Sequence, residues 1–86
     1  MNYFDWRQEI EKQREERWLW HLDDCMHKVP KMTDPSAVLK LISVNDAEHY
    51  KMIRISRNRQ QLADALIEFN KIAREHHYKL TGARLR

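Results

Sequence analysis

The chain has 86 residues, of which 42% are hydrophobic and 34% are charged, with one cysteine and a formal net charge of +3. This length allows one domain, and the composition is too apolar for a disordered chain. A lone cysteine excludes an intrachain disulfide, and charged residues interrupt every apolar run near the start. We therefore expect no secretory signal and no membrane partner, and predict a single cytoplasmic domain over residues 1–86.

Residues 2–28 are predicted to form a helix, because they contain neither glycine nor proline and stop before a proline. Its apolar residues fall into two stripes. Tyr3, Trp6 and Ile10 make the first, and the second consists of Trp18, Leu22, Cys25 and Val29, with Leu19 and Met26 on its flank. On one straight helix the two stripes differ in direction by about 130°. Either the helix bends, or the first stripe faces another neighbour, and we predict self-association of the chain through this stripe.

The segment of residues 37–56 fits two structures. Two runs rich in Val and Ile, 38–44 and 50–56, fit strands, and the second run alternates with a period of two. The same residues fit two short helices, because Asp34 followed by Pro35 is a good helix start. We favour the hairpin. It predicts an α+β fold in which two helices flank a short β-hairpin, in the order α-β-β-α, and the alternative is an all-α bundle of three or four helices.

One apolar stripe runs without interruption between residues 58 and 80. Its members are Leu62, Leu66, Phe69, Ala73, His76 and Leu80. Their spacing of three and four residues predicts a helix that turns this stripe toward the core. Both ends carry signals, since Asn58 and Gln61 have capping-box spacing and Gly82, the only glycine, suits a left-handed residue after the helix.

The charge is divided unevenly between the two halves. Residues 1–50 carry seven Lys or Arg against ten Asp or Glu, whereas residues 51–86 carry nine against three. On the last helix, the face opposite the core stripe collects an aliphatic side chain, two cations and an aromatic ring: Ile67, Lys71, Arg74 and Tyr78. We predict that this strip binds a partner protein. Trp18 and Trp20 are predicted to contribute, because tryptophan and arginine are enriched in interface hot spots.

A second basic run leads into the last helix and comprises Lys51, Arg54, Arg57 and Arg59. Arginines beside a helix N-terminus suit phosphate contacts, because free backbone N–H groups lie there. The run supports an alternative function, that of a nucleic-acid-binding regulator using the basic second half. The net negative charge of the first half argues against general nucleic-acid binding, so protein docking is the favoured prediction.

Residues capable of chemistry do not form a recognisable reactive motif. His21 and Cys25 lie one helical turn apart and His76 and His77 are adjacent, but Cys25 and His76 belong to apolar stripes. The sequence has no Gly-rich phosphate loop, nucleophile elbow or metal-binding helix motif. We therefore predict a small non-enzymatic regulatory protein without metal or cofactor, which docks on another protein as a homodimer or larger homo-oligomer.

Overall fold

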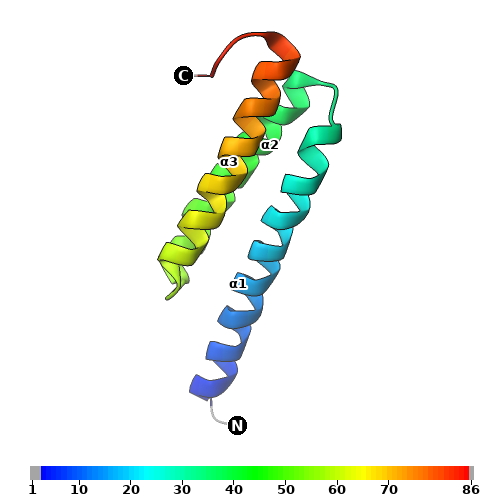
Figure 1. The fold of residues 1–86 in the computed structure, drawn as a ribbon. Helices are drawn as coiled ribbons and strands as arrows, with labels where there is room; N and C mark the ends of the chain where they lie inside the picture. The colour runs from blue at the N-terminus through cyan, green and yellow to red at the C-terminus, as the bar shows by residue number, and fades with distance from the viewer. Residues whose placement is uncertain (1–2, 86) are drawn as a thin grey trace.

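A computed structural model describes residues 3–85, which form three α-helices in an elongated bundle of 54 × 22 × 17 Å (Figure 1). Helix α1 covers Tyr3–Lys28 and runs into a short 3₁₀ turn, η1, at Val29–Lys31. Helix α2 covers Pro35–Ile55 and α3 covers Arg59–Thr81. Helix α3 packs against both other helices, whereas α1 and α2 touch each other much less. None of the described helices is long and apolar enough to cross a membrane.

Helix α2 occupies the segment for which we favoured a hairpin, so the α-β-β-α prediction is wrong and the all-α alternative fits: residues 3–85 contain no strand. The side chains of this segment that turn inward follow a helical spacing of four and three residues: Val38, Ile42, Asn45, His49 and Met52. Asn45 looks like a turn residue in the sequence, yet its side chain is fully buried. A polar residue at a core position hides the helical period when only apolar residues are counted.

The ends of α2 and α3 follow the predicted signals in part. Asp34 caps α2 as expected, since its carboxylate accepts a 3.0 Å hydrogen bond from the backbone N–H of Ser36. Gly82 ends α3 in the left-handed conformation, with φ of 73°. The capping box predicted at Asn58 does not form, because the Asn58 amide donates instead to the carboxylate of Glu15 on α1.

The core lies along the line where α3 meets the other two helices. Its buried hydrophobic side chains are Trp18, Leu22, Cys25, Val29, Val38, Ile42, Leu62, Phe69 and Ala73. Of the predicted stripe of α3, Leu62, Phe69 and Ala73 are buried, whereas the other three members are half-buried: Leu66, His76 and Leu80. His77 is buried although the sequence pattern did not select it.

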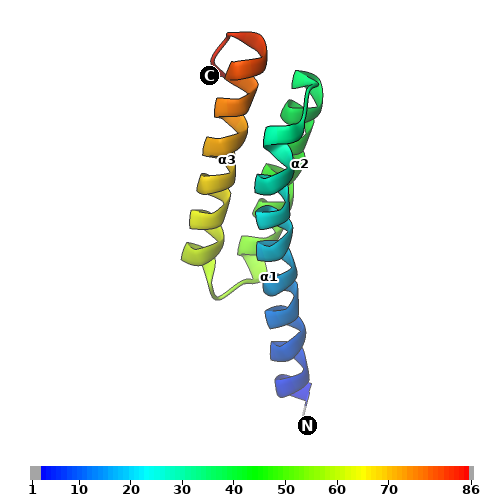
Figure 2. The ribbon, with the colours of Figure 1, turned by 45° about the vertical axis from the view of Figure 1, so that its right-hand side comes forward.

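Helix α1 is unbroken and extends beyond the hairpin formed by α2 and α3, which ends part-way along it (Figures 1 and 2). Its second stripe, from Trp18 to Val29, lies in the core, as predicted. Its first stripe lies on the extension, where Trp6 is exposed and Ile10 is half-buried. The side chain of Tyr3 lies outside the described residues. The two stripes can point in different directions on one straight helix, since only the second one has to pack against α3.

Candidate functional site

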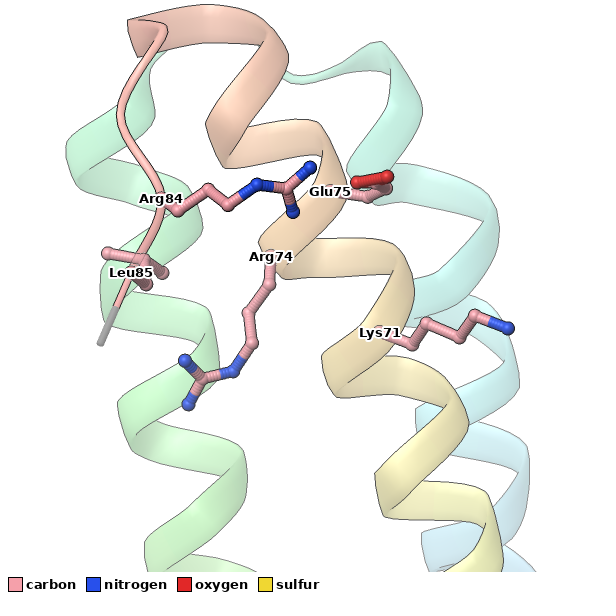
Figure 3. A pocket seen from close by; sticks show the side chains of 5 residues that line it. All are labelled: Lys71, Arg74, Glu75, Arg84 and Leu85. Atoms are coloured by element: carbon pink, nitrogen blue, oxygen red, sulfur yellow. The ribbon is translucent and has the colours of Figure 1, made fainter.

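The outer face of α3 and the C-terminal tail together form a basic hollow of about 320 Å³ (Figure 3). It is lined by Lys71, Arg74, Glu75, Arg84 and Leu85. In Figure 3 the Arg84 side chain reaches from the tail toward Glu75, whereas Lys71 and Arg74 extend from α3 in different directions. Three cations and one carboxylate therefore surround the hollow without meeting at a single point.

The tail completes the basic hollow because Gly82 turns the chain back along α3. The Arg84 guanidinium lies 4.5 Å from the ring centroid of Tyr78, close enough for a cation–π interaction. Leu85 packs against the core, and the Thr81 hydroxyl accepts a 3.1 Å hydrogen bond from the backbone N–H of Ala83. Arg84 and Leu85 belong to no periodic pattern in the sequence, and the glycine before them is the only signal of a turned tail.

The strip predicted on α3 stays together in the structure. Lys71, Arg74 and Tyr78 are exposed around the basic hollow, and Ile67, one turn before Lys71, is 65% exposed. The two tryptophans predicted to share in partner binding sit apart on α1. Trp18 is only 8% exposed, whereas Trp20 is 72% exposed.

The second basic run lies at the opposite end of α3 from the basic hollow (Figure 1). Lys51 and Arg54 belong to the end of α2, Arg57 to the connecting loop and Arg59 to the first turn of α3, and all four are exposed. The Lys51 ammonium lies 3.4 Å from the carboxylate of Glu48. The two basic regions are thus separate surfaces.

A buried carboxylate fixes the loop at this second end. Glu15 of α1 accepts hydrogen bonds from the Ser56 hydroxyl at 2.5 Å and from the Asn58 amide at 2.8 Å. These two donors, with the backbone N–H of Arg57, lower the pKa of Glu15 although its burial acts in the opposite direction. The polar segment in which Glu15 lies gave no sequence signal for this role.

Helices α1 and α2 leave an open groove between them, with a volume of about 390 Å³. It is lined by Arg14, Arg17, Trp18, His21, Val44, Asn45, Glu48 and Met52. The Trp18 and His21 rings stack with their centroids 5.4 Å apart. Their stacking and the Val44 and Met52 side chains make the floor of the groove largely apolar.

His21, which lines this groove, contacts its predicted neighbour Cys25, but in a geometry that is unsuited to nucleophilic catalysis. His21 Nε2 lies 3.0 Å from Asn45 Oδ1 and 3.5 Å from Cys25 Sγ. The amide oxygen accepts only, so Nε2 carries the proton in this contact and is not a base for the thiol. Burial also raises the pKa of Cys25, which keeps the thiol protonated and unreactive.

The other histidine pair is split between two environments. His76 Nε2 donates to the Met32 carbonyl oxygen at 2.6 Å, whereas the neighbouring His77 is buried in the core. Within the described part of the chain, no three His, Cys, Asp or Glu side chains are grouped so that they could hold a metal ion.

The basic hollow is therefore the site in which exposed charge, an exposed apolar side chain and a folded-back tail coincide. Comparisons of the chain with protein-family models, with curated proteins and with solved structures gave no match.

Proposed function

We propose that this chain is a non-enzymatic docking protein that binds an acidic, partly apolar segment of another protein on the outer face of α3. The observation that carries the proposal is the position of Arg84. Its stacking on Tyr78 adds a third cation to Lys71 and Arg74 at the basic hollow. A side chain already held in place loses less conformational entropy on binding than a free one.

The spread of the charges favours an extended segment over a small anion. From Ile67 to Tyr78 the face of α3 is about 16 Å long, at about 1.5 Å per residue. The cations are distributed around the basic hollow and do not converge (Figure 3). Several carboxylates along one peptide match this arrangement, and a single phosphate or carboxylate does not.

The apolar residues on the same surface favour a protein partner. Ile67 is exposed at one end, and Leu85 lines the basic hollow at the other. Apolar side chains next to the acidic residues of a partner protein would bury Ile67 and Leu85, and this burial would add to the affinity. The phosphates of a nucleic acid offer no such apolar contact. The second basic run supplies exposed cations without a folded-back tail, and nucleic-acid binding through it is the alternative outcome of the test.

The test is fluorescence anisotropy with a labelled model peptide in which glutamates alternate with leucines. The variant Lys71→Glu with Arg74→Glu reverses two charges at the basic hollow, and we expect at least tenfold weaker binding, or about 1.4 kcal/mol. Both residues are exposed, so the free energy of unfolding should stay within about 0.5 kcal/mol of the wild type.

The matched control is Arg54→Glu with Arg57→Glu, which reverses two exposed charges of the second basic run. This control should bind the peptide as the wild type does. A labelled single-stranded oligonucleotide tests the alternative in the same assay. If the wild type binds the oligonucleotide, this binding weakens steeply as salt rises, and the Arg54→Glu, Arg57→Glu variant no longer binds it, then the function is nucleic-acid binding and not protein docking.

A further inference from the structure

Besides its buried stripe, α1 carries a repeating set of positions on a side that does not face the core. We call it the α1 seam, and its positions are separated alternately by three and four residues: Tyr3, Trp6, Ile10, Gln13, Arg17 and Trp20. This is the a/d spacing of a coiled-coil heptad repeat. At about 100° per residue, the seam points about 120° away from the buried stripe that begins at Trp18. It extends the first apolar stripe of α1 by three positions.

The α1 seam is open to solvent along its described length. Trp6 is 54% and Trp20 is 72% exposed, Gln13 and Arg17 are exposed, and Ile10 is half-buried. A hollow of about 340 Å³ lies within it, lined by Gln13, Glu16, Arg17 and Trp20. Two large exposed aromatic side chains on one helix face are typical of an interaction surface.

We infer that the occupant of the α1 seam is a second copy of this chain, paired with α1 parallel and in register. Side chains at a/d spacing pack against a second helix with the same spacing. Another copy of α1 has this spacing by symmetry. The seam lies beside the α1–α2 groove, to which its member Arg17 also contributes, and the first part of α1 extends beyond the hairpin of α2 and α3, so the bundle leaves the seam accessible (Figures 1 and 2).

The charges beside the α1 seam select the parallel orientation. Glu9 and Glu16 lie on one flank of the repeat, and Arg7 and Arg14 lie on the other. In a parallel pair opposite flanks meet, which brings Glu9 of one copy next to Arg14 of the other. In an antiparallel pair each flank meets itself, which sets arginine against arginine and glutamate against glutamate. The two pairs of opposite charges on the flanks favour parallel pairing, and they offset the contact of Arg17 with Arg17 of the other copy within the seam.

The pairing surface is on a different helix from the basic hollow, so self-association and partner docking stand independently. Sedimentation equilibrium of the whole chain measures the first directly. We expect a concentration-dependent dimer, and expect the variant Trp6→Ser with Ile10→Ser to weaken dimerisation at least tenfold while the helix content by circular dichroism is kept. Ile67→Ser removes an apolar residue that is 65% exposed from α3 and should leave the dimer unchanged. A wild-type chain that stays monomeric at several hundred micromolar would overturn the inference.

Charge exchange tests the orientation. Glu9→Arg alone and Arg14→Glu alone should each weaken the dimer, because each places like charges together in the parallel pair. An equimolar mixture of the two variants should form a heterodimer at least as stable as the wild-type dimer, because opposite charges then face each other on both flanks. Stronger self-association of Glu9→Arg, or a mixture that stays monomeric, would overturn the parallel arrangement.

Discussion

The carboxylate of Glu15 on α1 accepts a hydrogen bond of 2.5 Å from the Ser56 hydroxyl, which lies 41 residues later in the chain. Ser56 follows the last residue of α2, and its hydroxyl also accepts a 3.1 Å hydrogen bond from the backbone N–H of Asn58. One buried carboxylate thus organises the loop between α2 and α3 and sets the point along α1 where the hairpin ends.

Replacing Glu15 by Ala should destabilise the fold by about 1.5 to 3 kcal/mol, because the Ser56 hydroxyl and the Asn58 amide lose a charged acceptor in a buried place. Urea denaturation followed by circular dichroism measures this difference. Glu68→Ala, at an exposed position of α3, is the control and should change the free energy of unfolding by less than about 0.5 kcal/mol. Equal effects of the two substitutions would contradict the assigned role of Glu15.

The carboxylate of Glu15 should make the free energy of unfolding depend on pH. Its pKa is lower in the folded chain than in the unfolded chain, chiefly because of the Ser56 hydrogen bond. Its contribution is therefore fully present above the unfolded pKa and is lost as the pH falls through the folded pKa. The difference in free energy of unfolding between the wild type and Glu15→Gln should shrink from pH 7 to pH 3. A difference that stays constant over this range would show that the folded pKa is not lowered.

Core packing predicts an order of effects along α3. Phe69 is fully buried, and Phe69→Ala should cost about 3 to 5 kcal/mol. Leu66 is half-buried, so Leu66→Ala should cost less than Phe69→Ala, although the two lie on the same sequence stripe. Urea denaturation of the two variants gives the comparison, and the reverse order would contradict the observed burial.

The thiol of Cys25 should react slowly in the folded chain. It is buried, and burial raises its pKa, so little thiolate is available at neutral pH. Labelling with a chromogenic disulfide reagent at pH 7.5 should be slow in buffer and fast in urea. Fast labelling without denaturant would indicate that the helices open locally at this position or that the thiol is activated there.

The sequence predicts α1 and α3 well because their core positions are apolar and keep a helical period. It fails for α2 because Asn45 takes a core position, where it contacts His21 of α1. Reading only the apolar residues, one sees two short Val- and Ile-rich runs separated by a polar turn. The helix becomes evident only when the contact with another helix is known.

The candidate site, too, can be predicted where a helical period decides it and not where a tertiary contact does. The shared face of Ile67, Lys71, Arg74 and Tyr78 can be predicted because helical geometry alone decides it. The contribution of Arg84 depends on a left-handed Gly82 and on a ring contact with Tyr78, and neither has a periodic signal. For the α1 seam, the apolar half was visible in the sequence, whereas Gln13 and Arg17 concealed its continuation.

The position of Gly82 also has a consequence for proteolysis. The residues after it supply Arg84 and Leu85 to the basic hollow, yet the side chains that are fully buried lie before it. Cleavage of the chain after Gly82 would therefore remove one wall and one charge of the partner surface while sparing most of the core. Affinity for an acidic partner and resistance to unfolding are thus separable by a single cut after Gly82.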